Sequence, residues 1–489
     1  MPRFLLPATL LLTACAAAFA QSPVAPALEL TDCRISAGPG YPGIEARCGL
    51  FSRPLDPADP EAGMIDLNVA VVPALSLEPA PDPLVPIAGG PGQSTVHFYA
   101  GWFTAFERVR QERDILLVDQ RGTGESAPMT CDIDDDIVTG AYSKELTLQV
   151  TEDCLALLPH DPRFFTTSVA VADLEAVRKA LGYDALNLYG ISYGSRVAQH
   201  FARRYPESTR TIIIDGVVPP QLPLGPDIAI QSQRAIDRVL DRCAEDARCN
   251  ERFPELRESF AALRERLADQ SMLISLPDPV TATINETEFD NEQFATAIRL
   301  LLYNPQTVAL LPLLIDEAAN GNITPLAAQF QMVATSLGES LNIGMHNSVM
   351  CTEDAPFISP DMIDEAALAA SYMGPLQLEA IQTMCSVWPG GTFDDDLREP
   401  LRTDKPVLLL SGAADPITPP DYATMAAVEL SNAWLLTGKD QGHGLAAVGC
   451  MPRVIDTFIK AARLEDGVAD CLDDAFTMPF FLNFSGPAP

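Results

Sequence analysis

The chain is poor in basic residues and in histidine. Its 489 residues include 32 Lys and Arg against 66 Asp and Glu, and only five His. The resulting formal charge of −34 argues against binding to nucleic acids or to anionic membrane surfaces, because their phosphates would repel it. The same charge favours solubility and, more weakly, attraction for cationic substrates. The scarcity of histidine leaves few candidates for a catalytic base.

Long apolar runs are also missing. After the N-terminus no stretch is long and apolar enough to span a bilayer. Residues 1–20 combine one Arg, a short apolar run and small residues, which is typical of an export signal. Two processing sites stay open. "AFA" fits cleavage before Gln21, whereas "LTAC" resembles a bacterial lipoprotein box ending in a lipid-bearing Cys15. We expect an exported protein, periplasmic or secreted, with a lipid anchor if Cys15 is used.

The cysteines lack the spacing of a zinc site. No C-x-x-C occurs, and no His stands at ligand spacing from a cysteine pair. Ten of the eleven cysteines follow the signal, and an even number in an exported chain indicates disulfides. The ten fall into neighbouring couples, which predicts sequential pairing: Cys33–Cys48, Cys131–Cys154, Cys243–Cys249, Cys351–Cys385 and Cys450–Cys471.

The order of apolar patterns predicts an α/β fold. Buried strands such as "PLVPI", "DILLVD", "LNLYG", "TIIID" and "PVLLL" alternate with helical patterns, which indicates a mostly parallel sheet covered on both faces. From about residue 220 to 402 the pattern is mainly helical. We therefore expect a signal over 1–20, a first core part over 21–219, a helical cap over 220–402 and a second core part over 403–489.

The stretch "GISYGSR" places Ser192 between Gly190 and Gly194, after a predicted strand and before a predicted helix. This G-x-S-x-G context is what a nucleophile elbow requires, because the serine sits exposed on a strained turn and the glycines allow close packing. The backbone N–H of Tyr193 would supply one oxyanion donor. A second should come from "GGPG", where Gly90 is our first choice and Gly92 the alternative.

The base and the acid are expected in loops after later strands. His443 lies between glycines after the strand "NAWLLTG" near the chain end. His200 would lie about 12 Å from Ser192 along one helix, too far to act on it. Asp415 follows the strand that precedes the one before His443, and the order Ser, Asp, His fits an α/β-hydrolase. Asp421 and Asp440 are weaker alternatives for the acid.

The motifs together resemble the α/β-hydrolases of the proline iminopeptidase and tripeptidyl aminopeptidase type, which are serine peptidases. "GGPG", "DQRGTGES", "GISYGSRVAQHFARRYPESTRTIIIDG", "GAADPITP" and "GHG" carry the resemblance, over residues 65–220 and 406–450. It implies an α/β-hydrolase fold with an inserted cap, catalytic Ser192, Asp415 and His443, and removal of N-terminal residues from peptides. One departure is Ala88, which stands where many relatives place a His.

We therefore expect an exported serine aminopeptidase that acts on peptides with a free N-terminus and needs no metal or organic cofactor. Two other functions remain open. A carboxylesterase would use the same triad, since the fold does not decide between amides and esters. A non-catalytic surface-binding protein is the other class, although such a protein would have no need of a complete catalytic triad.

Recognition of a free N-terminus calls for carboxylates at the end of the pocket. In relatives such acids come from the cap, and here the cap contains "SVMCTEDAP". Glu353 is our first choice because of its longer side chain, with Asp354 beside it. The disulfide from Cys351 to Cys385 would hold the segment rigid. The alternative is that both acids are solvated at a turn.

Overall fold

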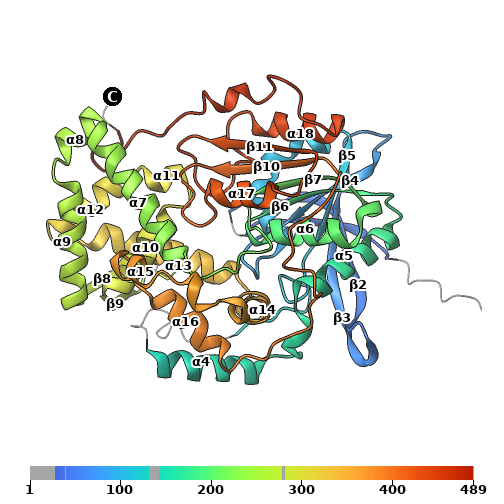
Figure 1. Ribbon diagram of the computed structural model, residues 1–489, viewed down its shortest axis with the longest axis horizontal. Coiled ribbons are helices and arrows are strands. Elements are labelled where there is room, and N and C mark those ends of the chain that lie inside the picture. Colours follow the sequence, from blue (N-terminus) through green and yellow to red (C-terminus); the bar gives the residue numbers. More distant parts are fainter. Residues whose placement is uncertain (1–27, 39, 132–142, 278–280, 488–489) are drawn as a thin grey trace, which may run out of the picture.

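The computed structural model describes residues 28–38, 40–131, 143–277 and 281–487 (Figure 1). The expected signal and Cys15 lie outside these residues. The main sheet has nine strands in the order β1-β2-β3-β5-β4-β6-β7-β10-β11. The strands are β1 (Thr31–Ile35), β2 (Ile44–Asp56), β3 (Asp59–Val72), β4 (Ala80–Ile87), β5 (Arg113–Val118), β6 (Leu186–Ile191), β7 (Thr209–Asp215), β10 (Val407–Gly412) and β11 (Ala433–Gly438).

The sheet is parallel from β5 to β11, and β1, β2 and β3 add an antiparallel edge. The parallel strands were expected from their continuous apolar runs, because both faces are covered. In β10, Val407 and Leu409 face one core cluster while Leu408 and Leu410 face the other. This alternation is the two-residue period of a strand.

Helices cover both faces of the sheet (Figure 1). One face carries α5 (Thr167–Leu181), α6 (Tyr193–Arg204) and α17 (Pro420–Ala427). The other face carries α1 (Thr95–Trp102), α2 (Glu107–Arg110) and α18 (Met451–Ala461). The fold is therefore the predicted α/β-hydrolase architecture.

A mainly helical cap is inserted between β7 and β10 (Figure 1). Its helices are α7 (Ile228–Glu245), α8 (Ala247–Arg252), α9 (Leu256–Asp269), α10 (Asn291–Leu301), α11 (Pro305–Val308), α12 (Leu311–Ala319), α13 (Thr324–Ser340), α14 (Ile343–Val349), α15 (Glu365–Ala370) and α16 (Leu376–Cys385). The residues expected at helical spacing are buried, as Phe260, Leu263 and Leu267 illustrate in α9. A hairpin of β8 (Met272–Pro277) and β9 (Ile284–Phe289) interrupts the helices.

Two segments outside the expected cap range pack against the cap. Helix α4 (Lys144–Leu157) lies along α16, and Cys154 shares a small apolar cluster with Cys351 and Trp388. Near the C-terminus, Phe480 is buried in the cap core, and the Phe481 N–H donates to the Ala309 carbonyl at 2.9 Å. The cap is thus tied to the core before and after its own segment.

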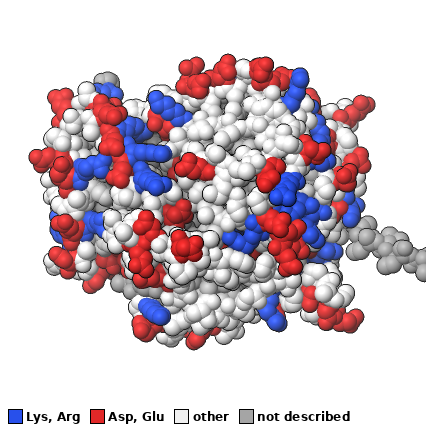
Figure 2. All heavy atoms as spheres, in the orientation of Figure 1, with Lys and Arg blue, Asp and Glu red and all other residues white. Residues whose placement is uncertain are grey.

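The structure joins ten cysteines in the five sequential pairs that the sequence predicted. The Cys33–Cys48 pair joins β1 to β2, and the Cys351–Cys385 pair joins the segment after α14 to the end of α16. Within the described ranges, no helix is long and apolar enough to cross a membrane. Carboxylates are spread over cap and core alike on the face in Figure 2, whereas Lys and Arg gather in a few groups.

One buried ion pair joins the motif after β5 to the helical layer. The Arg121 side chain has no exposed surface and binds both carboxylate oxygens of Asp173 on α5, at 2.7 and 3.0 Å. The same guanidinium donates to the backbone carbonyls of Leu55 and Phe164. Because all of these acceptors belong to other segments, Arg121 fixes the "DQRGTGES" loop against the sheet.

We expect Asp173→Ala to destabilise the fold by about 3–5 kcal/mol, because it leaves the buried Arg121 charge without a counter-ion. Urea unfolding followed by tryptophan fluorescence measures the effect. Asp237→Ala is the control, since Asp237 pairs with Arg257 at the surface and such pairs contribute at most about 1 kcal/mol. Equal losses in the two variants would contradict the role given to Arg121.

Candidate active site

The candidate catalytic residues follow the C-terminal ends of neighbouring parallel strands. Ser192 comes directly after β6, Asp415 shortly after β10 and His443 after β11. Strands β6, β7, β10 and β11 are consecutive in the sheet, and the ends of parallel strands meet at one edge. The topology therefore brings residues more than 200 positions apart to one place.

Ser192 occupies a strained turn between β6 and α6. Its φ of 55° and ψ of −129° lie in a region that non-glycine residues rarely adopt. The turn is held from below, because the Ser192 N–H donates to the Asp215 carbonyl at 2.9 Å. A side chain at Gly190 would collide with the backbone of Gly194, and one at Gly194 with the carbonyl of Ile87. Both glycines are therefore required by close packing, as the motif predicted.

Asp415 and His443 form a buried hydrogen-bonded pair. The His443 Nδ1 lies 2.8 Å from Asp415 Oδ2. The other oxygen, Oδ1, accepts the backbone N–H groups of Ile417 and Thr418, both at 2.9 Å. The Thr418 hydroxyl donates to Oδ2 at 2.7 Å. These bonds fix the carboxylate, which in turn leaves Nε2 as the imidazole nitrogen available for proton transfer.

The two partners change each other's acidity. Burial alone would raise the pKa of Asp415, but the His443 charge and the hydrogen bonds bring this pKa below its ordinary value. Burial alone would lower the pKa of His443, but the Asp415 carboxylate outweighs burial, so this pKa is raised. The raised basicity suits a group that must accept a proton from a hydroxyl.

The "GGPG" loop lies against the candidate nucleophile. A side chain at Gly89 would come within 2.9 Å of Ser192 Cβ, so the backbone passes directly beside the serine. Gly90 and Gly92 have φ values of 106° and 109°, which glycine adopts without strain. The Tyr193 N–H is in the first turn of α6, where it has no intrahelical acceptor. The choice between Gly90 and Gly92 as second oxyanion donor stays a prediction.

The cap holds this loop from above. The Asn342 backbone N–H donates to the Gly92 carbonyl at 3.0 Å, and its side-chain amide donates to the same oxygen at 3.2 Å. His346 Nδ1 lies 3.2 Å from the Pro91 carbonyl. Burial lowers the pKa of His346, so the imidazole is neutral and can donate from Nδ1. Cap residues therefore complete the support of the oxyanion loop, which the sequence motifs did not indicate.

Glu353 and Asp354 lie on the π-helix η4 (Met350–Asp354), where their side chains contact α5 and α6, the helices next to the candidate nucleophile. Neither has any exposed surface. Glu353 accepts the Thr167 N–H and hydroxyl, both at 2.7 Å, and that hydroxyl lies 2.6 Å from the Tyr193 hydroxyl. Asp354 pairs with both terminal nitrogens of Arg196 at 2.9 Å. The alternative of two solvated acids is therefore wrong, while ammonium binding stays a prediction.

Asp215 is a site residue that the sequence reasoning missed. Its buried carboxylate accepts the Tyr189 hydroxyl at 2.9 Å and the backbone N–H groups of Leu445 and Ala446 at 2.8 and 2.9 Å. Leu445 is two residues beyond His443, and the Asp215 carbonyl binds the Ser192 N–H. Asp215 thus holds the loops of both Ser192 and His443. An aspartate at the C-terminal end of a predicted strand is the local signal that drew attention to Asp415, and it could have been used here.

The other histidines lie outside this arrangement. His200 is buried on α6, 2.8 Å from Asp394, and His97 is exposed. His200, Asp394 and Asp396 could bring three ligand atoms together, and they are the one such group among the described residues. Arg204 lies 3.5 Å from Asp394 and 3.8 Å from Asp396, so a cationic side chain of the protein already faces both carboxylates. The cluster therefore gives no support for a metal.

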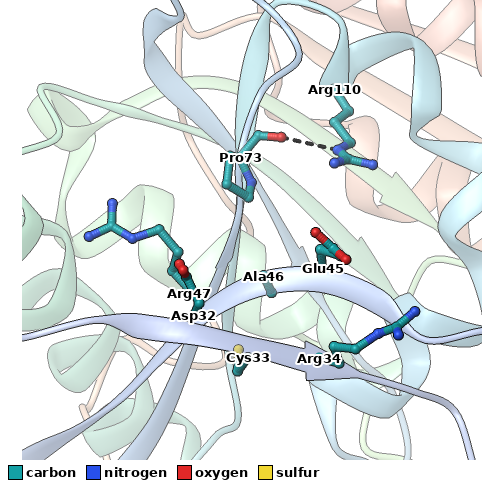
Figure 3. A pocket seen from close by; sticks show the side chains of 8 residues that line it. All are labelled: Asp32, Cys33, Arg34, Glu45, Ala46, Arg47, Pro73 and Arg110. Carbon is teal, nitrogen blue, oxygen red and sulfur yellow. Dashed lines mark hydrogen bonds between the residues drawn. The ribbon is translucent and has the colours of Figure 1, made fainter.

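A cavity of about 500 Å³ lies away from the triad, beside β1 and β2. Figure 3 shows that the Arg34 and Arg47 side chains point in opposite directions, while Arg110 donates to the Pro73 carbonyl at 3.0 Å. Its lining residues are Asp32, Cys33, Arg34, Glu45, Ala46, Arg47, Pro73 and Arg110. The charged side chains around this cavity do not converge on one point, and none of the candidate catalytic residues lines it. We therefore do not place the reaction there.

We expect Asp215→Asn to lower kcat about 10- to 100-fold with a smaller change in KM, because an amide cannot accept the loop N–H groups on both atoms and His443 is displaced. Ester hydrolysis and the rate of labelling by a fluorophosphonate both report on the serine. Asp114→Asn is the matched control, since Asp114 also accepts a tyrosine hydroxyl and a backbone N–H, but on β5. Equal loss in both variants at matched thermal stability would refute a positioning role.

Comparison with known proteins agrees with this geometry. The α/β hydrolase fold family matches residues 82–263, which include Ser192, and the family described as TAP-like protein matches 370–471, which include Asp415 and His443. The serine protease Hip1 of Mycobacterium tuberculosis (strain ATCC 25618 / H37Rv) is 27% identical over 91% of each chain.

Two further relatives are peptidases by name. The tripeptidyl aminopeptidase of Streptomyces lividans is 23% identical over 88% of this chain and 85% of its own. The proline iminopeptidase of Neisseria meningitidis (serogroup B, strain MC58) is 27% identical over 28% of this chain and 32% of its own. The chain therefore has the α/β-hydrolase fold and is similar to tripeptidyl aminopeptidases and proline iminopeptidases, as its motifs predicted.

Proposed function

We propose that the protein is an exported serine aminopeptidase that releases residues from the N-terminus of peptides. The observation that carries the catalytic part is the buried Asp415–His443 pair at the same sheet edge as Ser192 on its strained turn. The peptidase part is supported by the names of its relatives and by the TAP-like match. No metal or organic cofactor enters the proposal.

The reaction proceeds through an acyl-enzyme. Ser192 Oγ attacks the scissile carbonyl while His443 Nε2 takes its proton, and Asp415 stabilises the resulting imidazolium. The Tyr193 N–H and the Gly90 N–H, or that of Gly92, hold the oxyanion. The imidazolium then gives its proton to the leaving amine as the C–N bond breaks. Water, deprotonated by His443, attacks the acyl-enzyme and releases the N-terminal fragment and Ser192.

Recognition of the free N-terminus is assigned to Glu353, with Asp354 beside it. Both carboxylates have polar partners within the protein, and neither is exposed. Burial raises the pKa of Glu353 to about 7, so a cationic partner would favour its ionised form. Binding an ammonium requires a free lone pair, and each Glu353 oxygen retains one besides the bond to Thr167. The substrate would have to gain access to this side chain.

A carboxylesterase is the competing function, because the triad alone does not distinguish amides from esters. A non-catalytic surface-binding protein would leave the Ser192 turn and the Asp415–His443 pair without a use. Export is supported by the five disulfides, which form and persist in oxidising compartments. Lipid attachment at Cys15 is a proposal that mass spectrometry of the mature N-terminus tests.

We expect the protein to cleave aminoacyl or tripeptidyl nitroanilides, and N-terminal acetylation of the best substrate to abolish cleavage. Ser192→Ala removes the covalent step and should abolish turnover with the fold intact. Glu353→Gln should raise KM at least tenfold for free-amine substrates. If Glu353→Gln instead lowers kcat for free and blocked substrates alike, Glu353 supports Tyr193 through Thr167. Equal cleavage of acetylated and free substrates would favour the esterase or an endopeptidase.

The pH dependence follows from His443. Only the neutral imidazole accepts the serine proton, so kcat/KM should fall as the pH drops through the pKa of His443. Because Asp415 raises this pKa, we expect the inflection above the ordinary histidine value of about 6.5. A pH–rate profile over pH 4 to 9 measures it, with circular dichroism at each pH to show that the fold persists. A rate that stays constant down to pH 5 would contradict His443 as the base.

A further inference from the structure

One cationic side chain of the cap stands beside the candidate triad with no part in the mechanism. Arg299 lies near the end of α10, one helical turn before Tyr303. Its guanidinium carbon is 6.0 Å from the centre of the Tyr303 ring, and Nη2 lies 3.4 Å from the Tyr303 hydroxyl. A bond of that length to a neutral hydroxyl is weak.

Tyr303 connects this arginine to the catalytic histidine. The Tyr303 ring meets the His443 ring edge to face, with 5.3 Å between centroids. The backbone carbonyl of Tyr303 accepts the backbone N–H of His443 at 2.7 Å. The guanidinium and the candidate catalytic imidazole therefore both lie beside the ring of Tyr303.

Within the described part of the chain, no carboxylate pairs with Arg299, and its buried Nε has no hydrogen-bond acceptor. By contrast, Arg252 and Arg257 of the cap are paired with aspartates. Half-buried guanidinium groups are normally bound to carboxylates or carbonyls, because their desolvation is otherwise uncompensated.

The charge of Arg299 acts on two histidines near the candidate site. Burial lowers the pKa of His346 beside the oxyanion loop, and Arg299 lowers that pKa further. On the triad side, where burial lowers and Asp415 raises the pKa of His443, the Arg299 charge opposes Asp415. A positive charge that acts on both histidines is placed to attract an anionic group of a bound substrate.

We propose that Arg299 binds a carboxylate of the substrate, so that the enzyme prefers peptides that carry one close to the scissile bond. The planar fork of N–H donors on a guanidinium matches the two oxygens of a carboxylate. The carboxylate is either an acidic side chain or the C-terminus of a short peptide. This inference rests on the proposed peptidase function for the identity of the substrate, but the anion site itself does not.

The first experiment uses the wild-type protein and matched peptide pairs. Tetra-alanine as the free acid is compared with its C-terminal amide, and amidated tetrapeptides with Glu at each position in turn are compared with those with Gln. We expect kcat/KM to favour the carboxylate member of at least one pair by about 10- to 100-fold, as a charge-assisted bond implies. The pair that shows the preference identifies the source of the carboxylate. No preference in any pair would overturn the proposal.

The second experiment uses variants. Arg299→Gln should reduce the preference ratio about 10- to 100-fold, and Arg299→Lys should retain part of it. Arg264→Gln is the control, since Arg264 is another cap arginine, on α9, and donates to the Ala370 carbonyl. An unchanged ratio in Arg299→Gln would overturn the proposal, as would the same reduction in the Arg264 variant.

The outcome stays interpretable if the proposed function fails. Should the wild-type protein cleave no peptide, the same variants are compared on 4-nitrophenyl butyrate and on the mono-4-nitrophenyl ester of succinate. A preference for the anionic ester that Arg299→Gln removes would support the carboxylate site in an esterase. The absence of that preference would refute the site independently of the peptidase assignment.

Discussion

The arrangement of the candidate catalytic loops depends on the buried end of β7. There the Asp215 carbonyl holds the Ser192 turn, and its carboxylate holds the loop that follows His443. Burial raises the pKa of this carboxyl to about 6, which means that the fold keeps a costly ionised group at neutral pH. Tyr189 and two backbone N–H groups compensate for that cost. One residue in the middle of the sheet therefore fixes the positions of both the Ser192 turn and the loop of His443.

The cap is part of this arrangement and not only a cover. Asp354 binds Arg196, which lies four residues after Ser192 on α6. Glu353 reaches the Tyr193 hydroxyl through Thr167, and Asn342 fixes the carbonyl of Gly92. These contacts lead, directly or through Thr167, to α6 or to the "GGPG" loop, which carry the candidate nucleophile and the proposed oxyanion donors. Burial makes each bond strong, because water does not compete for the donors.

The sequence predicted the fold and the three candidate catalytic residues because their signals are local. Ser192, Asp415 and His443 each follow a short apolar strand and have glycine or proline within two residues. Continuous apolar runs likewise identified the parallel strands. Strands β1 and β2 of the antiparallel edge were not foreseen, because β2 carries exposed and buried residues in an irregular order. The helical cap was expected from periodicity, whereas its hairpin of β8 and β9 gave too short a pattern.

Long-range partners could not be predicted in the same way. The "CTED" segment was recognised as a functional candidate, but Glu353 finds its partner 186 positions away at Thr167, and Asp354 finds Arg196 158 positions away. The local sequence does not distinguish a carboxylate that binds a substrate from one that binds another part of the protein. Asp215 and Asp415 show the same limit, since both are strand-end aspartates and only their position in the sheet decides which one contacts His443.

The position of the cap bonds has a consequence for specificity. A substrate that presses on η4 or α14 also moves the residues that support Tyr193 and Gly92, and these carry the proposed oxyanion donors. Contacts at the far end of a substrate can therefore stabilise the transition state more than the bound substrate. Under that condition binding energy raises kcat and does not only lower KM. Arg299 belongs to the same group of cap residues, because its ring partner Tyr303 contacts His443. In this molecule the residues proposed to recognise the substrate therefore lie among those that align the candidate catalytic groups.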